Sequence, residues 1–543
     1  MEFDYVIAGG GSAGCVLANR LSADPKISVC LVEAGGGGKD VLIRAPAGAA
    51  GMISGRPKVN NWAFQTVPQA GLNGRRGFQP RGRALGGSSA INAMLYVRGH
   101  PSDYDDWADL GADGWDWASC APWFRASERN ARGSGDDHGA EGPLQVADQN
   151  APRPVTGAFL EAAQQMQWPA TDDFNADQEG VGLYQVTQFF DGPQKGERCS
   201  AAAAYLHPVM DRPNLTVMTG TLADRISFDG TRATGLHVRK GRTALHLKAR
   251  REVISSLGAF GTPALLQRSG IGPGDLLASL GIEVVAHSPL VGENLQDHLD
   301  LILAYRSKRR DTFALNPLGG LAFARGALEW RKSGTGMITT PYAEGGAFLK
   351  TDPNLPRPDI QLHFVPAIVD QHNRKLHLSF GYSCHICVLR PASRGSVRIG
   401  SADPAKAPVI DPAFLSDPAD IPVMIKGARM MDTMLKTDAF APWRGKRLYP
   451  HDGSDAAWEQ DIRNRADTIY HPVGTCHMGG SDAPCDPAGR VRGTQSLRVV
   501  DASLMPRLVG GNTNAPVIMM AERLAQTVLT APEQPAPFGP PPG

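Results

Sequence analysis

Three glycines near the beginning of the sequence have the spacing of a turn that binds a dinucleotide. Gly9, Gly11 and Gly14 follow an apolar run at residues 3–8 and lead into a helical pattern at residues 15–21. The first glycine permits the turn, the second lets the backbone approach a pyrophosphate, and the third lets the helix meet the strand. A second apolar run ends at Glu33, whose carboxylate can accept hydrogen bonds from a ribose diol. The predicted contacts are Gly9, Gly11, Ser12, Ala13, Gly14, Glu33 and Ala34. They predict a dinucleotide and leave open whether it is FAD or NAD.

Two other groups of reactive side chains suggest a metal or redox site, and we expect neither. His471, Cys476 and His477 lie close together but lack a fourth ligand at a useful spacing for zinc. Cys384 and Cys387 lie in a run that alternates like a strand, so their sulfur atoms should lie on opposite faces. The eight cysteines have no framework spacing, which indicates free thiols in a reducing compartment.

Composition excludes several classes of protein. The 543 residues exceed what one hydrophobic core holds, so we expect two joined domains. A net charge of +1 argues against a general nucleic-acid binder. We find neither a secretory leader nor an apolar run long enough to span a membrane, and expect a cytoplasmic protein. A basic cluster at residues 306–310, with Arg331 and Lys332, indicates either a solvated face or peripheral contact with the inner face of the cytoplasmic membrane.

Several motifs are similar to those of the glucose-methanol-choline (GMC) family of FAD-dependent oxidoreductases, over essentially the whole chain. One is the glycine-pair segment 82–92, and another is segment 258–272, which includes Gly258, Pro263 and Gly270. The resemblance implies FAD as the cofactor. Ile91 stands where some members attach FAD through a histidine, so we expect noncovalent FAD. The further cofactor contacts that the resemblance implies are Trp62, Arg83, Gly86, Gly87, Ser88, Asn92, Ala93, Met94, Ala223, Asp501, Ala502, Asn512 and Thr513.

The C-terminal motifs, at residues 470–479 and 511–516, resemble the catalytic segments of this family. Oxidation of an alcohol needs a base with a pKa near neutrality to take the hydroxyl proton while a hydride leaves the carbinol carbon. The resemblance implies that His471 is this base and that Asn514 orients the hydroxyl group. The alternative for His471 is a structural core histidine, and for Asn514 a helix cap before Pro516.

The substrate and the electron acceptor are less constrained. Glu344 matches a segment where choline-oxidising relatives bind a quaternary ammonium, but alkanol-oxidising relatives carry a similar glutamate. Segments 363–367 and 384–391 resemble alkanol and polyglycol dehydrogenases, so we expect an uncharged primary alcohol, aliphatic or aryl, to be oxidised to the aldehyde. We expect a quinone or another carrier as the acceptor rather than oxygen. The alternatives are a choline dehydrogenase and an alcohol oxidase; more remote are a hydroxynitrile lyase, an NAD-dependent dehydrogenase and a non-enzymatic flavoprotein.

The elements that must position these residues form a mixed α/β protein, α+β overall. We expect a discontinuous, Rossmann-like FAD-binding domain at residues 1–155, 196–310 and 456–529. A substrate domain at residues 156–195 and 311–455 should contribute an antiparallel sheet that covers the flavin, because residues 360–364 and 380–389 alternate like strands. Residues 530–543 are rich in proline and predict a flexible tail.

Overall fold

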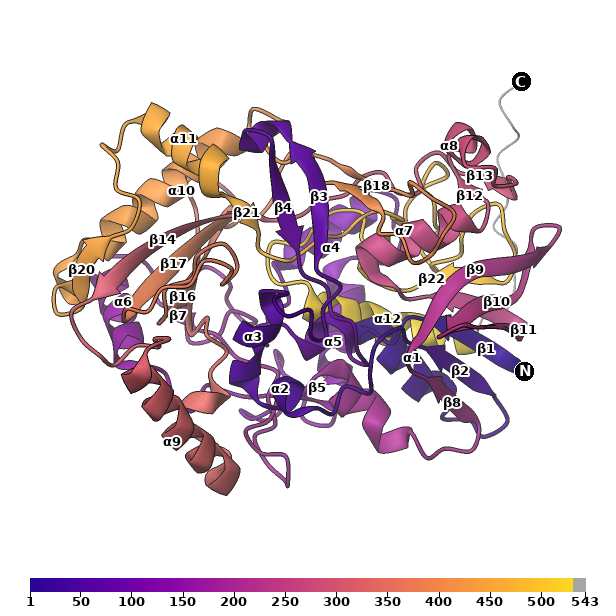
Figure 1. The fold of residues 1–543 in the computed structure, drawn as a ribbon, viewed down its shortest axis with the longest axis horizontal. Helices are drawn as coiled ribbons and strands as arrows, with labels where there is room; N and C mark the ends of the chain where they lie inside the picture. Colours follow the sequence, from indigo (N-terminus) through magenta and orange to yellow (C-terminus); the bar gives the residue numbers. More distant parts are fainter. Residues whose placement is uncertain (531–543) are drawn as a thin grey trace.

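A seven-stranded sheet forms the centre of the nucleotide-binding half (Figure 1). Strands β1, β2, β8 and β11 pair in parallel, and β22 pairs in parallel with β11. Strands β9 and β10 extend the sheet in antiparallel pairs beyond β11. The structure is a computed structural model that describes residues 1–530. The strands are β1 (Glu2–Ala8), β2 (Val29–Val32), β8 (Leu215–Met218), β9 (Thr221–Asp229), β10 (Arg232–Lys240), β11 (Thr243–Ser255) and β22 (Leu497–Val499).

Two helices far apart in the sequence pack together beside this sheet. Helix α1 (Ser12–Leu21) follows the glycine turn and packs on β1 and β2, and α12 (Asn514–Thr530) packs on α1. Arg20 of α1 donates two hydrogen bonds of 2.7 Å to the Glu522 carboxylate of α12. The predicted strand, turn and helix at the beginning of the chain are therefore confirmed, and so is the helix that the alternative for Asn514 placed at Pro516.

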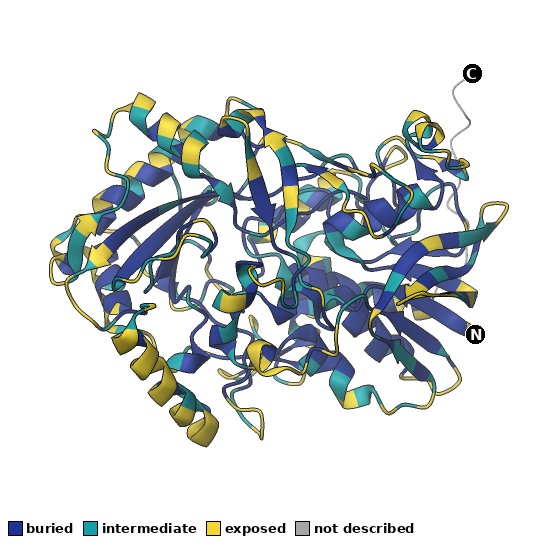
Figure 2. Cartoon of the chain, viewed as in Figure 1, coloured by how far each residue is buried: buried dark blue, intermediate teal, exposed yellow. Residues whose placement is uncertain are grey.

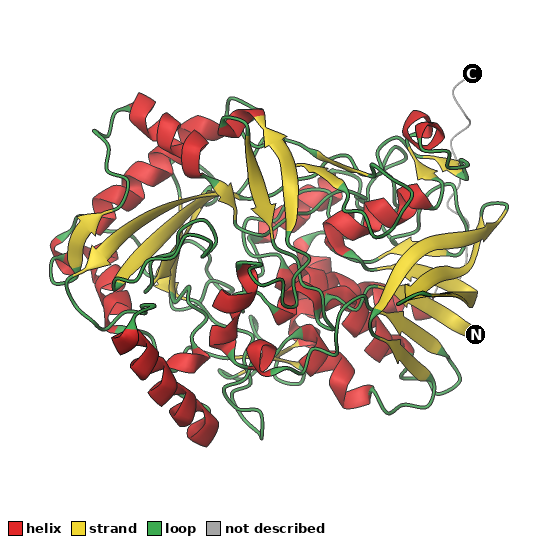
Figure 3. Ribbon diagram, viewed as in Figure 1, coloured by secondary structure: helices red, strands yellow, loops and turns green. Residues whose placement is uncertain are grey.

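A second seven-stranded sheet forms the other half of the molecule, and its strands lie apart from the first sheet (Figure 3). All its pairs are antiparallel, as predicted for the sheet that covers the cofactor. Each half has its own apolar core. The strands are β7 (Gly180–Leu183), β14 (Leu299–Ser307), β15 (Gly345–Leu349), β16 (Ile360–Val365), β17 (Gly381–Val388), β20 (Arg444–Arg447) and β21 (Asp467–Thr468).

The domain boundaries differ from the prediction at two places. Strand β14, assigned to the FAD-binding domain, pairs with β17 in the second sheet, so the chain crosses between the halves before residue 299. Strand β21 also pairs with β14. The region 311–455 contains long helices as well as strands, because its strands need helices to cover their apolar face. Within this region the long helices are α9 (Pro317–Ser333) and α10 (Asp420–Leu435), and α10 packs on the core of the second sheet. Helix α6 (Pro154–Gln165), earlier in the chain, and α11 (Asp455–Arg465), which begins where the region ends, pack on the same core.

Shorter elements complete the described chain. Within residues 1–530 no helix is long and apolar enough to cross a membrane. Of the predicted tail, Thr530 ends α12 and the remainder lies outside the described residues. The shorter helices and strands are α2 (Val41–Arg44), α3 (Ala49–Ile53), α4 (Pro101–Asp109), α5 (Trp117–Ser127), α7 (Gly258–Arg268), α8 (Gly274–Ser279), β3 (Phe64–Gln69), β4 (Arg75–Gln79), β5 (Glu128–Asn130), β6 (Leu144–Val146), β12 (Ile271–Gly272), β13 (Ala286–His287), β18 (Ser396–Arg398) and β19 (Val409–Asp411).

The positions of Cys384 and Cys387 confirm that their side chains lie on opposite faces of a strand. Cys384 and Cys387 lie on β17, and their side chains belong to different apolar clusters on the two faces of the sheet. All eight cysteines are buried and unpaired. Among the described residues, no group of histidine, cysteine and carboxylate side chains is arranged to hold a metal ion.

Candidate active site

A cavity of about 2190 Å³ connects the glycine turn after β1 with His471 and with the second sheet. Its volume exceeds the roughly 300–1,000 Å³ of ordinary small-molecule pockets, so it has room for a dinucleotide and a substrate together. All of the predicted cofactor residues line it except Gly14, Arg83 and Gly86. His471 and Asn514 line it as well.

The glycine turn has no room for a side chain at its first and third glycines. A Cβ atom on Gly9, whose φ is +103°, would lie 2.4 Å from the Ser256 carbonyl oxygen, and one on Gly14 would lie 1.9 Å from the Gly9 carbonyl oxygen. Gly14 is thus the contact between helix and strand, which explains why it does not line the cavity. Gly11 has only the Ser256 oxygen within 4 Å, at 3.7 Å, so its backbone is open to a ligand.

Glu33 lies at the end of β2 beside this turn. Its carboxylate accepts hydrogen bonds from the Gly10 amide at 3.0 Å and the Gly35 amide at 2.7 Å. Burial raises the pKa of Glu33 to about 7. The carboxylate also lines the cavity, where a ribose diol could donate to its remaining lone pairs.

The glycine pair at residues 86 and 87 packs directly on the first turn. A Cβ atom on Gly87 would lie 2.7 Å from Gly11 Cα, so the close approach of the two loops requires glycine. The Gly86 amide donates to the Gly10 carbonyl oxygen, which holds Gly86 behind the cavity wall. The Arg83 guanidinium lies 4.7 Å from the centre of the Trp62 ring, so Arg83 supports a wall residue without lining the cavity.

Arg198 is a residue of this region that the sequence did not predict. It is fully buried, and one guanidinium nitrogen donates to the Asn92 side-chain oxygen at 2.8 Å and to its carbonyl oxygen at 2.7 Å. Burial lowers the pKa of Arg198 to about 9. Arg198 therefore fixes the loop from which Asn92, Ala93 and Met94 reach the cavity.

His471 lies at the centre of a hydrogen-bond chain that defines its tautomer. His298 Nε2 lies 2.9 Å from the Leu389 carbonyl oxygen, which only accepts, so this nitrogen carries a proton. His298 is fully buried, and burial lowers its pKa to about 4, so the ring is neutral and its Nδ1 is an acceptor. His471 Nδ1 lies 2.9 Å from that atom and must therefore donate to it.

The consequence is that His471 Nε2 bears a lone pair. This nitrogen accepts from the Asn512 side-chain amide at 3.1 Å, on the cavity side. Burial lowers the pKa of His471 well below its ordinary value, so the ring is neutral at pH 7. The backbone amide of His471 donates to the Asp297 carboxylate at 2.9 Å and fixes the base of the side chain. The site thus contains a neutral, oriented proton acceptor.

The two asparagines near the start of α12 have different partners. Asn512 contacts His471, as described, although it was predicted to contact only the cofactor. Asn514 Oδ1 accepts from the Ser12 hydroxyl at 2.8 Å, which joins the start of α12 to the start of α1. Both asparagines line the cavity.

Glu344 does not line the cavity, so the prediction that it contacts the substrate is wrong. Its carboxylate accepts from the Thr156 hydroxyl at 2.5 Å, the Arg153 amide at 2.7 Å and the Thr340 hydroxyl at 3.3 Å. The side chain is buried behind the wall that Ala343 lines, and burial raises the pKa of Glu344 to about 7. Glu344 therefore ties helix α6 to the second sheet.

Asp501 and Ala502 line the cavity beside the first sheet, as expected. The Asp501 carboxylate, however, is directed into the protein. It accepts from the Thr262 hydroxyl at 2.5 Å, the Gly258 amide at 2.9 Å and the Ser503 hydroxyl at 2.6 Å. Asp501 thus fixes segment 258–262, one of the motifs noted in the sequence, to the turn that follows β22.

Two further histidines reach the cavity from the second sheet. His363 on β16 is paired directly with His385 on β17, and both line the cavity. Neither ring nitrogen of His363 nor Nε2 of His385 has a hydrogen-bond partner within residues 1–530. The other ring nitrogen of His385, Nδ1, lies 2.8 Å from the Asp300 carboxylate. A buried ring nitrogen without a partner can bind a hydroxyl group. The sequence places each histidine in a segment that alternates like a strand. It does not show that these two strands are neighbours or that the two histidines are aligned.

Comparison with known proteins agrees with this geometry. The GMC oxidoreductase profile matches residues 3–300, and its C-terminal counterpart matches residues 391–521. The chain is 44% identical to an alcohol dehydrogenase [acceptor] of Pseudomonas putida, covering 97% of this chain and 96% of the relative. It is 43% identical to the mitochondrial choline dehydrogenase of Homo sapiens, covering 98% and 90%.

Solved structures share the fold. The pyridoxine 4-oxidase from Mesorbium loti superposes with a TM-score of 0.86 at 32% identity, covering 97% of this chain and 99% of that one. A formate oxidase superposes with a TM-score of 0.88 at 26% identity, covering 97% and 98%. The glycine cradle, the Glu33 carboxylate and the size of the cavity fit FAD, and the chain belongs to the GMC family of FAD-dependent oxidoreductases.

Proposed function

We propose that the protein oxidises a primary, uncharged alcohol to the aldehyde, with His471 as the base. The observation that carries this proposal is the neutral His471 ring, whose Nε2 lone pair is presented to the cavity by the chain from Leu389 through His298. When bound, FAD supplies the acceptor for the hydride that leaves the carbinol carbon. His471 Nε2 takes the hydroxyl proton when the substrate hydroxyl replaces the Asn512 amide at that lone pair. The Asn512 and Asn514 amides, both at the cavity surface, hold the hydroxyl oxygen in line with the base.

An uncharged substrate is favoured because few acidic residues line the cavity. Among the described residues, these are Glu33 and Asp501 alone. Glu33 lies beside the glycine turn, and the Asp501 carboxylate is directed into the protein. A quaternary ammonium near His471 would thus meet no carboxylate, whereas His363 and His385 offer polar contacts that suit a hydroxyl group.

Three finer points belong to the same proposal. Electrons pass to a quinone or another carrier, which the likeness to an alcohol dehydrogenase [acceptor] supports. FAD is bound noncovalently, which Ile91 at the cavity wall supports. The protein acts in the cytoplasm, which eight unpaired, buried cysteines support.

The reaction is tested by mixing the purified protein without oxygen with alkanols, benzyl alcohol, a polyglycol and choline, and following flavin absorbance. We expect an uncharged alcohol to bleach the flavin, and His471→Ala to slow bleaching by about 10²- to 10⁴-fold. His246→Ala, on β11 and outside the cavity, is the matched control. No bleaching by any alcohol, or equal rates in the His471 variant, would refute the proposal. Faster bleaching by choline than by any alkanol would refute the uncharged substrate.

The finer points have separate readouts. Reoxidation of the reduced enzyme by a water-soluble quinone should be faster than by air, and the reverse order would make the protein an oxidase. Acid precipitation should release the flavin into the supernatant, whereas a yellow pellet would mean a covalent bond.

A further inference from the structure

Helix α9 presents an apolar face to solvent, and this unusual orientation has a clear structural origin. The Asn316 side chain caps its beginning by accepting from the Gly319 amide, and Gly334, with φ of +67°, ends it. Gly319 and Gly326 are the only buried residues of the helix. A Cβ atom on Gly319 would lie 2.0 Å from the Ala314 carbonyl oxygen, and one on Gly326 would lie 2.3 Å from Met337 Cγ. These two glycines, seven positions apart, define the packed face.

Leucines occupy the opposite face. Leu321 and Leu328 are also seven positions apart, and each follows a buried glycine by two residues, which places it about 200° around the helix. Leu321 is 50% exposed and Leu328 is 72% exposed. Figure 2 shows α9 as an almost entirely exposed helix at the edge of the molecule. Within residues 1–530, these leucines are at least half exposed and add little to the packing of the helix, so a large part of their apolar surface is free to contact a partner.

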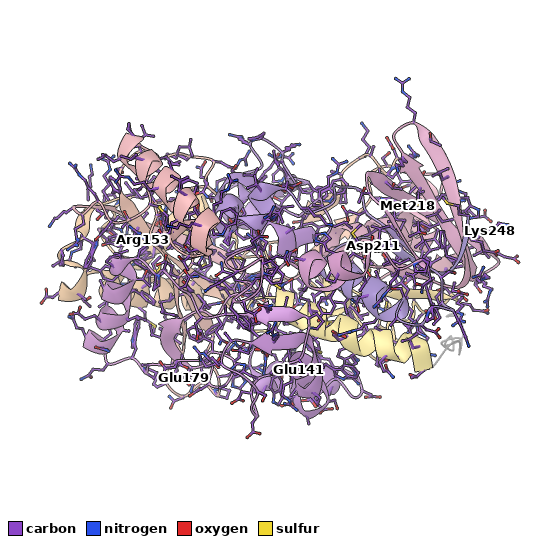
Figure 4. All side chains as sticks on the ribbon, turned by 90° about the horizontal axis from the view of Figure 1, so that it is seen from below. Glu141, Arg153, Glu179, Asp211, Met218 and Lys248 are labelled. Carbon is purple, nitrogen blue, oxygen red and sulfur yellow. The ribbon has the colours of Figure 1, made fainter. Side chains whose placement is uncertain are left out.

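A neighbouring loop extends this apolar face. The Asn316 side-chain amide donates to the Leu378 carbonyl oxygen at 2.8 Å, which joins the beginning of α9 to the loop that carries Leu376 and Leu378. Arg153, labelled in Figure 4, donates to the Asp311 carbonyl oxygen in the segment that leads into α9. We call the exposed leucines of both segments the leucine rim. It comprises Leu315, Leu318, Leu321, Leu328, Leu376 and Leu378, all at least half exposed.

Basic residues are frequent in α9 and in the segment that precedes it. Residues 306–333 contain seven basic and two acidic side chains, although the whole chain has a net charge of only +1. Within residues 1–530, Arg309 is the only one of these seven with an ion-pair partner. On α9, Arg325 and Lys332 lie on one side of the leucine face and Arg331 on the other. Apolar side chains flanked by unpaired cations are the pattern of a helix that lies in the interface of an anionic bilayer.

From this arrangement we propose that the leucine rim docks on an anionic phospholipid membrane. A second copy of the chain fits less well, because face-to-face packing would bring the two sets of cations together. The rim also borders the active-site cavity, since Leu315, Leu318 and Leu376 line it. Docking would therefore open the cavity directly to substrates or electron carriers dissolved in the bilayer.

The test is co-sedimentation of the FAD-loaded protein with vesicles of phosphatidylcholine alone or mixed with phosphatidylglycerol. We expect strong binding to the anionic vesicles and weak binding to the neutral ones. Leu321→Ser and Leu328→Ser should each weaken binding about tenfold. Arg325→Gln and Lys332→Gln should each weaken binding to anionic vesicles about fivefold and leave binding to neutral vesicles unchanged.

Controls separate this inference from a folding defect and from the proposed reaction. Leu110→Ser changes a leucine outside the rim that is 43% exposed, at the end of α4, and should bind as the wild type. Neither Leu321 nor Leu328 lines the cavity, so flavin bleaching by a soluble alcohol should persist in both variants. Absent vesicle binding, or binding that ignores the leucines, would overturn the inference. Loss of a dimer in the leucine variants without vesicle binding would assign the rim to a second copy.

Discussion

Removing the hydrogen-bond acceptor that His298 provides should inactivate His471, although His471 itself is unchanged. In His298→Leu, the His471 Nδ1 proton loses its acceptor in a fully buried site. An unpartnered buried N–H group costs about 1–3 kcal/mol. The ring avoids this cost when the proton moves to Nε2, where the lone pair needed for catalysis is then lost. The fraction of enzyme with a competent base should fall by the same free energy, about 5- to 150-fold.

The assay is the rate of flavin bleaching by a saturating alcohol without oxygen, compared among wild type, His298→Leu and His298→Asn. An asparagine offers both an acceptor for His471 and a donor for the Leu389 carbonyl oxygen, so it should recover a large part of the rate. A merely structural defect would lower flavin content and thermal stability in both variants and would not be relieved by asparagine. A leucine variant that keeps its flavin and bleaches at the wild-type rate would refute the tautomer argument.

Three other substitutions test separate parts of the structure. Gly14→Ala should abolish FAD retention, seen in the absorbance of the purified protein, because its Cβ would lie 1.9 Å from the Gly9 carbonyl oxygen; a yellow variant would contradict this. Asn512→Ala should reduce the bleaching rate at unchanged flavin content, whereas Asn514→Ala, which also loses the Ser12 contact, should lower both; identical behaviour would show that the two contacts are not distinct. His138→Gln should lower the urea midpoint at neutral pH. Burial alone lowers the pKa of His138, but hydrogen bonds to Asp173 and Glu128 raise this pKa from 6.5 to about 9. The stability that His138 contributes is therefore complete below about pH 6.5 and lost as pH rises through about 9. A difference between the two proteins that persists at higher pH would argue against this role.

The parts of this protein that were predictable from sequence are those set by neighbours along the chain. The glycine turn, α1 and α12 follow from local spacing, and the opposite faces of Cys384 and Cys387 follow from the twofold period of a strand. Their geometry depends on little beyond a few adjacent residues. Family resemblance added His471, whose type alone does not distinguish a base from a core histidine.

The parts that were missed depend on contacts between distant segments. His298 becomes important only because segment 294–298 pairs with segment 471–474, through the bridge between Gln296 and Val473. Glu344 matched a motif, but the direction of its side chain depends on α6, which is far away in the sequence. Nor does spacing reveal that β14 joins the second sheet, because a single apolar strand fits either domain.

The position of β14 has a consequence for how the two halves of the enzyme cooperate. Asp297 holds the backbone of His471 and His298 holds its ring, and β14 begins at the next residue, Leu299. The same short segment therefore orients His471 and leads into a strand of the sheet that carries His363 and His385 on the cavity wall. A displacement of that sheet must move the ring that sets the tautomer of His471. Substitutions on the second sheet should then change the rate of the chemical step as well as substrate affinity, because segment 297–299 holds both His471 and the sheet that forms the cavity wall.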